Sequence, residues 1–249
     1  QSVLWNTLAG IVFKSQKAKY KLNLIHIQNG ESSAGYFKQA LSQDGVGGGG
    51  FETIFKDALL YTQRSVSNAQ LSGKHSGESD WVIEWNIAPT LNVVLDKDHR
   101  ITPLRFTQEG SYVISPSASS YPIRIWRELY EFNGAAKLDF LNKTEWFNRP
   151  AKLKFGAGFI FKRREFKTDD YTFSSTTQVV ENGDANNLLL ENNLWTTENQ
   201  SGTFLVYGDS YDPANSYDGD QFIGSAYGSA EFKLTDNFNV VAGLRLESF

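Results

Sequence analysis

Side chains with carboxylate or amide oxygens are frequent in one long polar stretch of the chain, residues 168–220. Asp212, Asn215, Asp218 and Asp220 lie close together near its end. Carboxylate and amide oxygens are the ligands that calcium takes, six to eight at a time. The spacing lacks the fixed glycine and terminal glutamate of an EF-hand, and Asp and Asn are equally typical of solvated turns. The four residues are therefore the candidate calcium site, with turn formation as the favoured alternative.

Aromatic residues in the same stretch suggest a second chemistry. Trp195, Tyr207, Tyr211 and Tyr217 stand among amide side chains. Such rings can stack on a sugar or close over the entrance to a ligand site, because one part of each ring is apolar and another is polar. The alternative is a long loop that packs on its own side chains. These four residues are the candidate ligand-binding set, and self-packing is the favoured alternative.

Residues typical of catalysis show no working arrangement. The chain has no cysteine, which excludes a cysteine nucleophile and a thiolate metal site. His26, His75 and His99 are far apart and form no HExxH or similar ligand pair. Ser115 and Ser117 lie in a Ser-rich segment without the GxSxG pattern of a nucleophile elbow. We therefore predict that the protein is not an enzyme and that it needs no cofactor apart from the candidate calcium ion.

Composition narrows the class of protein further. The net charge of −4 and the scattered basic residues argue against a nucleic-acid partner, which needs clustered Lys and Arg. Aromatic residues make up 14% of a chain whose mean hydropathy is −0.39. Apolar rings among polar neighbours are typical of barrel walls, and also of aromatic-rich soluble β-sandwiches. No run approaches the ~20 apolar residues of a membrane helix, so a helical membrane protein is excluded.

The elements that would position these residues are strands. Apolar and polar side chains alternate without interruption over residues 81–96, and the same period recurs over 152–163 and 238–247. Successive side chains of a strand point to opposite faces, so each segment presents one apolar and one polar face. Further segments follow the pattern: 3–13, 20–28, 58–73, 130–140 and 222–234. We expect about eight strands, each long enough for the ~9–11 residues that cross a bilayer at a tilt.

Short turns and long connections alternate between these strands. We expect four hairpins, approximately 3–28, 57–96, 122–167 and 219–249. Their turns are short and polar, whereas the stretches between hairpins, 29–56, 97–121 and 168–218, are long. Short periplasmic turns and long extracellular loops are the layout of a transmembrane β-barrel. The predicted fold class is thus all-β, a transmembrane antiparallel β-barrel of up-and-down strands. Its Gly-rich polar faces suit the wide lumen of a larger barrel.

Several stretches also resemble a known family. Segments 57–65, 95–104, 114–127, 149–156 and 241–247 are similar to barrel segments of TonB-dependent outer-membrane receptors of the Bacteroidetes type. The resemblance implies a barrel of about 22 strands, occluded by a plug domain, in a Gram-negative outer membrane. It also implies import of a scarce ligand, such as a siderophore, glycan, peptide or cofactor, with energy from TonB. Outer-membrane lipid, the plug, TonB and a surface lipoprotein are the partners that the resemblance implies.

The chain departs from this family pattern in one respect, because no plug domain or TonB box is recognisable in it. We therefore expect residues 1–249 to be the middle portion of the barrel, with the remaining strands elsewhere in the polypeptide or its complex. A closed eight-stranded barrel would contradict this expectation. Two alternatives stay open: a non-transporting barrel subunit of an envelope assembly or secretion complex, and a soluble secreted β-sandwich.

Overall fold

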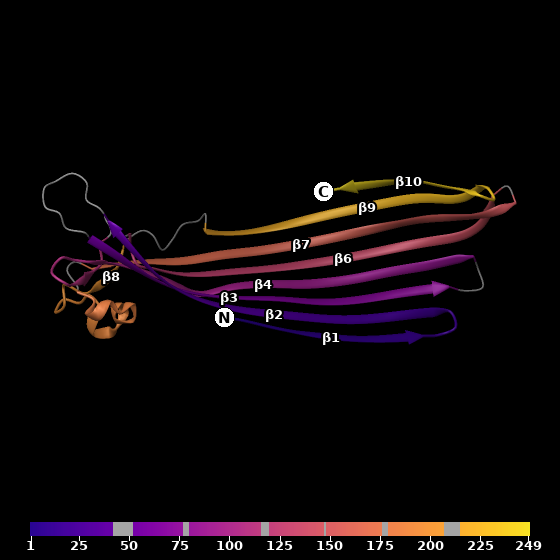
Figure 1. Ribbon diagram of the computed structural model, residues 1–249. Coiled ribbons are helices and arrows are strands. Elements are labelled where there is room, and N and C mark those ends of the chain that lie inside the picture. The colour runs from indigo at the N-terminus through magenta and orange to yellow at the C-terminus, as the bar shows by residue number, and fades with distance from the viewer. Residues whose placement is uncertain (42–51, 77–79, 116–119, 147, 176–178, 207–214) are drawn as a thin grey trace.

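The computed structural model describes residues 1–41, 52–76, 80–115, 120–146, 148–175, 179–206 and 215–249. It is all-β, as predicted, with an antiparallel sheet of ten strands (Figure 1). The strands are β1 Ser2–Lys14, β2 Ala18–Leu41, β3 Glu52–Ser76, β4 Trp81–Phe106, β5 Tyr112–Val113, β6 Ile123–Trp146, β7 Arg149–Ser175, β8 Thr203–Leu205, β9 Ser216–Thr235 and β10 Phe238–Ser248. Three short 3-10 helices follow β7: η1 Glu181–Gly183, η2 Ala185–Leu189 and η3 Glu191–Asn193. Within the described ranges, no helix is long and apolar enough to cross a membrane.

Neighbours in the chain are neighbours in the sheet. The main path runs β1-β2-β3-β4-β6-β7-β9-β10, while β5 pairs with β4 and β8 with β7. Figure 1 shows this order from indigo β1 to yellow β10, with the short turns together at one end, which we call the turn end. In the described part of the chain β1 and β10 form the two edges of the path, so the sheet is open.

Local sequence explains two of the turns. Between β1 and β2 the backbone N–H of Ser15 donates to the carbonyl of Ala18 (2.8 Å), and the Ser15 hydroxyl accepts from the N–H of Ala18 (3.1 Å). Asn148 precedes β7 with φ of 57°, a left-handed conformation that Asn tolerates better than most residues. Polar turn formers therefore close the hairpins at the positions where the sequence has them.

The strands run much further than the alternation predicts. Stretches 29–56, 97–121 and 168–218 were expected to be loops, but β2 continues to Leu41, β4 to Phe106 and β7 to Ser175. β2, β4 and β7 are 24, 26 and 27 residues long, against the ~9–11 that cross a bilayer. The expected loop boundaries were wrong because these outer segments are strands in which apolar and polar side chains do not alternate regularly.

The cross-strand register separates the sheet into two faces. Residues directly opposite each other share a face, and one row is apolar across nearly its whole width: Ile11, Leu22, Leu71, Ile87, Ala136, Phe159 and Gly224. We call this side the apolar face and the side of Asn86 the polar face. On β7 the apolar face runs from Leu153 to Phe161 and then becomes charged at Arg163. Its large side chains are exposed, for example Ile87 at 50% and Phe159 at 48%.

Two register shifts interrupt the sheet, one between β3 and β4 and the other between β4 and β6. They lie at Leu59/Thr62 and at Asp96/His99, where Asp98 has φ of 57°. Such bulges insert an extra residue and change which side chains face which side. Arg124 (Nε to Oδ1, 2.7 Å) and Arg100 (Nε to Oδ2, 2.7 Å) donate to the Asp98 carboxylate. Burial alone would raise the pKa of Asp98, but these two guanidinium groups outweigh it, so the pKa lies below its usual value.

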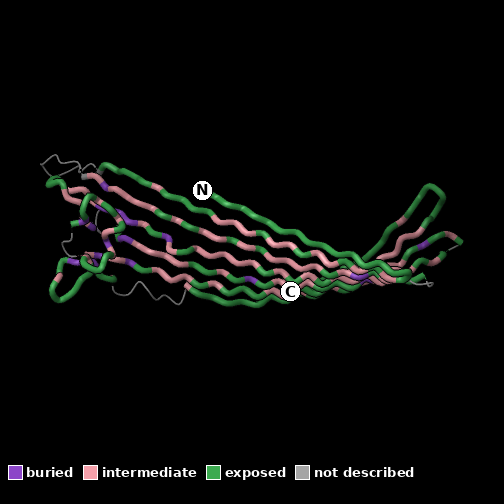
Figure 2. The backbone as a smooth tube through the Cα atoms, turned by 90° about the horizontal axis from the view of Figure 1, so that it is seen from below, coloured by how far each residue is buried: buried purple, intermediate pink, exposed green. Residues whose placement is uncertain are grey.

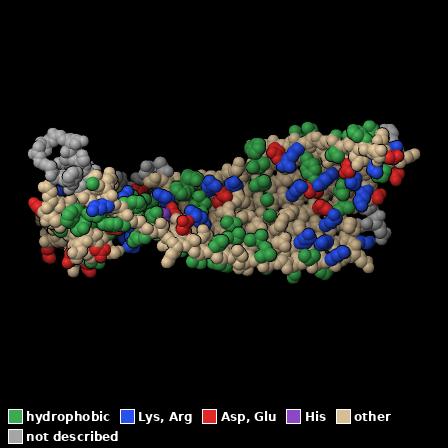
Figure 3. Space-filling model, in the orientation of Figure 1, with side chains coloured by type: hydrophobic (Ala, Val, Ile, Leu, Met, Phe, Trp, Pro, Cys, Tyr) green, Lys and Arg blue, Asp and Glu red, His purple; other side chains and the backbone are tan. Residues whose placement is uncertain are grey.

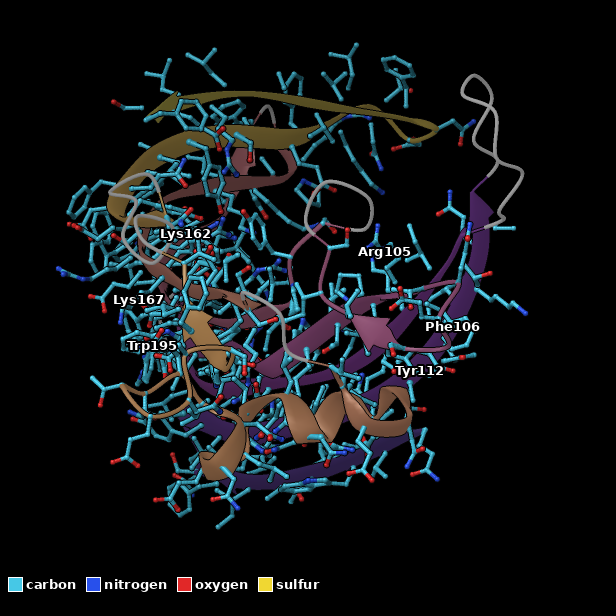
Figure 4. The ribbon with its side chains drawn as sticks, turned by 90° about the vertical axis from the view of Figure 1, so that its left-hand side faces the viewer. Arg105, Phe106, Tyr112, Lys162, Lys167 and Trp195 are labelled. Atoms are coloured by element: carbon cyan, nitrogen blue, oxygen red, sulfur yellow. The ribbon has the colours of Figure 1, made fainter. Side chains whose placement is uncertain are left out.

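The compact part of the molecule is a small cap at the end away from the turns. Leu104 of β4, Ile114, Val180 and Leu188 form its buried core, and Tyr112 and Leu189 pack against them. The 3-10 helices make up much of the cap (Figure 4). In Figure 2 many of the buried residues gather at this end, whereas the rest of the sheet is mostly intermediate or exposed. A protein this open has little core of its own, and most of its large apolar side chains face outward.

Candidate functional site

Charged side chains form one row across the polar face near the turn end. From β1 to β10 its members lie directly opposite one another: Lys14, Lys19, Lys74, Glu84, Asp139, Gly156, Tyr227 and Arg245. Figure 3 shows Lys and Arg gathered toward this end on the face turned to the viewer, with Asp and Glu among them. The residues of the row come from eight strands, so only the register of the folded sheet brings them together.

A groove of about 460 Å³ lies over the first part of this row. We call it the lysine groove. It is lined by Lys19, Lys21, Ser72, Gly73, Lys74, Glu84, Trp85, Asn86, Lys137 and Asp139. Four lysines against two carboxylates leave its lining with an excess of two positive charges. The groove is therefore the strongest candidate on the polar face for binding a small charged molecule.

Ion pairs fix the middle of the row. Nζ of Lys74 lies 2.6 Å from Oε1 of Glu84, and Nζ of Lys137 lies 3.0 Å from Oδ2 of Asp139. The Tyr227 hydroxyl donates to Asp139 across β7. That bridge needs the glycine between them, because a Cβ at Gly156 would stand 2.5 Å from Oδ1 of Asp139 and 2.9 Å from Cε1 of Tyr227.

Farther from the turns, Glu131 of β6 collects donors from three strands. Nδ2 of Asn92 lies 3.1 Å from it, Nδ2 of Asn133 2.9 Å and Nε of Arg164 2.7 Å. Glu131 is only 7% exposed, and a carboxylate removed from water needs such partners. This cluster is saturated with protein partners, so it holds β4, β6 and β7 together rather than offering a ligand site.

Ion pairs are unevenly distributed over this part of the polar face. Toward β10, Nζ of Lys152 lies 3.2 Å from Glu231, and Nε of Arg245 donates to Glu247 at 2.7 Å. Toward β1 no described residue forms a hydrogen bond or ion pair with the side chains of Lys14, Lys19 and Lys21, and all three are exposed. Lys19 and Lys21 thus bring unpaired positive charge to one wall of the lysine groove.

The aromatic residues predicted to bind a ligand do not form one site in the described structure. Trp195 lies in the cap, 47% exposed, with its backbone N–H donating to Thr203 (2.8 Å). Figure 4 places it on the same side of the view as Lys162 and Lys167. Tyr217 belongs instead to β9, where its ring packs 5.3 Å from that of Phe166. Tyr207 and Tyr211 lie outside the described residues.

A different aromatic group, missed by sequence reasoning, lies beside the cap. The rings of Tyr36 and Phe55 are 5.7 Å apart, those of Phe55 and Phe106 6.2 Å, and those of Phe106 and Tyr112 4.8 Å. Tyr36 is 63% exposed. The rings lie on strands expected to be loops, and their register across β2, β3 and β4 is the only signal that joins them.

The candidate calcium ligands are also dispersed. Nδ2 of Asn215 donates to Asp170 (3.1 Å), and Asp220 lies 4.0 Å from Nη1 of Arg163. Asp218 and Asp220 extend from β9, where they are opposite Glu165 and Arg163. Asp212 lies outside the described residues. Among the residues that are described, no three acidic or histidine side chains come together to hold a metal ion, and the calcium site stays a prediction.

Sequence reasoning found the strands that carry the lysine groove but not the groove. Lys14 and Lys19 lie in the polar turn expected between strands 3–13 and 20–28, and Lys74 follows the strand expected over 58–73. The available signal was the spacing of Lys19 and Lys21, two residues apart and hence on one face. Neither a protein family nor a curated protein matches the chain.

Proposed function

We propose that this chain is part of the wall of a transmembrane antiparallel β-barrel in a Gram-negative outer membrane. The barrel would be that of a TonB-dependent receptor, which binds a scarce extracellular ligand and imports it with energy from TonB. The observation that carries the proposal is the exposed apolar face. On β7 it runs from Leu153 to Phe161 before the charge at Arg163, and ~9–11 residues in a tilted strand match the height of the bilayer core.

The unpaired edges support a larger barrel of about 22 strands rather than an isolated sheet. The N–H and C=O groups along β1 and β10 have no partner strand beyond them in the described chain. In hydrocarbon each unsatisfied backbone group costs several kcal/mol. On the apolar face both edge strands also carry exposed side chains, with Ile11 at 68% and Leu244 at 71%. Further strands that pair with β1 and β10 would satisfy these groups and complete the lipid-facing surface.

With the apolar face toward lipid, the positions of the polar face, the turn end and the cap follow. The polar face lines the lumen, the turn end is periplasmic, and the outer strands and cap project from the cell. Trp195 in the cap and Tyr36 in the outer part of β2 are among the exposed aromatic side chains available there to an arriving ligand. A siderophore, glycan, peptide or cofactor is the ligand class of such a receptor, and a surface lipoprotein would approach it from the same side.

Site-directed labelling tests the orientation, because the chain has no cysteine. The full-length protein, with any cysteine elsewhere replaced, would carry Lys38→Cys in the outer part of β2 or Lys17→Cys in the β1–β2 turn. A membrane-impermeant maleimide should label Lys38→Cys on intact cells and Lys17→Cys only after the outer membrane is permeabilised. Equal labelling of both on intact cells, or recovery of the protein in the soluble fraction, would overturn the proposal.

A second experiment separates transport from a purely structural role. Cells that lack TonB should retain the labelled barrel in the outer membrane but lose energy-dependent uptake of its ligand. Growth on limiting iron, glycan, peptide or cofactor sources, compared between strains with and without the receptor gene, identifies the ligand class. A correctly inserted barrel whose deletion and whose TonB dependence change no uptake would instead be a non-transporting subunit of an envelope assembly or secretion complex.

A further inference from the structure

We propose that the lysine groove binds a small oligoanion, a molecule with two or more phosphate or carboxylate groups about 5 Å apart, the distance between opposed residues of adjacent strands. The proposal concerns the polar face of β1, β2 and β3. It does not depend on whether the protein transports a ligand, because it follows from the register and charges of the sheet.

Positively charged side chains form a continuous row across β1, β2 and β3. Lys14, Lys19 and Lys74 are directly opposite one another on three adjacent strands. Like charges in directly opposed positions destabilise a sheet, and neighbouring strands are only ≈ 4.7–4.9 Å apart. An anionic group seated between two of these lysines would replace the repulsion with two attractions.

Carboxylates of the protein neutralise only part of the positive charge in the lysine groove. Glu84 pairs with Lys74 and Asp139 with Lys137. Lys19 and Lys21 have no such partner in the described structure and stand on one face of β2, with Lys14 beside them. Elsewhere on the polar face Lys152 is neutralised by Glu231 (3.2 Å). The remaining positive charge is therefore available to a ligand.

The volume of the lysine groove and the chemistry of its lining also suit a small anion. A groove of about 460 Å³ falls within the range of roughly 300–1,000 Å³ that is typical of small-molecule sites. Lysine ammonium groups are compact charges on flexible stems, which suits phosphate and carboxylate oxygens without fixed geometry. Ser72 and Asn86 also line the groove and add neutral polar groups. A compact oligoanion fits these features, whereas an acidic polypeptide would need a longer surface.

Binding of defined anions to the purified, natively folded full-length protein tests the proposal. Isothermal titration calorimetry at about 50 mM salt would use pyrophosphate and citrate as the probes, with inorganic phosphate and a hexaglutamate peptide for comparison. Pyrophosphate and citrate should bind more tightly than inorganic phosphate, because they bridge two lysines. The affinity should fall as the salt concentration rises.

The decisive comparison uses two double variants with the same loss of charge. Lys19→Gln with Lys21→Gln should weaken pyrophosphate binding by about tenfold, equivalent to about 1.4 kcal/mol. Lys143→Gln with Lys233→Gln removes two exposed lysines of the same polar face that do not line the groove. This control should change the affinity by less than about twofold if the groove is the site, since the two lysines contribute only a screened, long-range electrostatic potential at the groove.

Three results would overturn the proposal. They are equal weakening in both double variants, no measurable binding of pyrophosphate or citrate by the folded protein, and binding of the hexaglutamate peptide alone. Far-UV circular dichroism and resistance to protease verify that each variant is folded. The binding assay measures neither membrane insertion nor uptake, so a negative result would not contradict the proposed receptor function. A negative result in the labelling test would likewise not contradict anion binding in the groove.

Discussion

Replacing Phe159 with arginine should show which face of the sheet meets lipid. Phe159 lies on the apolar face of β7 with 48% of its surface exposed, and its neighbour Ile160 lies on the polar face with 40% exposed. The two residues are adjacent, apolar and similarly exposed. Phe159→Arg and Ile160→Arg therefore make the same chemical change on opposite sides of one strand.

The depth of Phe159 sets the expected cost. The apolar run on β7 extends from Leu153 to Phe161, so Phe159 is two residues from its centre at Ala157. At ~3.3 Å per residue and a tilt of about 40°, that is about 5 Å from the bilayer midplane. An arginine costs about 2–4 kcal/mol at the midplane and about 0–1 near the interface. We expect about 2 kcal/mol for Phe159→Arg, because the guanidinium can extend toward the level of Arg163.

Ile160→Arg should cost no more than about 0.5 kcal/mol, as for ordinary exposed sites, because its side chain would meet water in the lumen. Phe159→Gln controls for the lost contact between the rings of Phe159 and Phe222, whose centroids are 6.3 Å apart. Equilibrium unfolding of the full-length protein in lipid vesicles, followed by tryptophan fluorescence and heat-dependent gel mobility, gives the free energies. Equal costs for Phe159→Arg and Ile160→Arg would refute the assignment of the faces.

The remaining predictions concern single contacts. Gly73→Ala should lower the free energy of unfolding by about 1–3 kcal/mol, because the new Cβ would collide with the indole of Trp85. Gly224→Ala, with no atom within 4 Å of its Cβ position, should leave the denaturation midpoint unchanged. Leu104→Ala removes a side chain that is 1% exposed in the cap core, so limited proteolysis should cut within 179–206 while the sheet stays intact, reflecting a local loss of about 2–5 kcal/mol. Asp98→Asn should destabilise the outer sheet above pH ~4, and the difference from the wild type should vanish as the pH falls through the lowered pKa of Asp98, because the carboxylate stabilises only when charged.

Alternation of apolar and polar residues predicted the strands where one face is apolar and failed beyond them. Residues 81–96 alternate strictly and lie in β4, but the same strand continues through 97–106, which carries no such pattern. In water both faces of a strand can be polar, so the period-2 signal disappears while the backbone ladder continues. The shift at Asp96/His99 also reverses the phase, and a bulge of this kind has no clear mark in a single sequence.

The candidate site was less predictable than the fold. Charged residues could be assigned to a face from their spacing, but the row through Lys14, Lys19 and Lys74 depends on which residues of β1, β2 and β3 are opposite. A register slip of one residue would send each to the other side. The cap was missed for another reason: its core joins Leu104 to Val180, residues far apart in the chain, and neither segment alternates.

The sequential order of the strands bears on how such a protein could change in evolution. Every strand of the main path is bonded to the strands that precede and follow it, and no connection crosses another. A duplicated or deleted hairpin at an edge, such as β1 with β2, would change the width of the sheet by two strands and leave the pairings and faces of the other strands in phase. The sheet therefore has a modular two-strand order, so gene segments that encode such hairpins could be gained or lost without changing the path of the remaining chain.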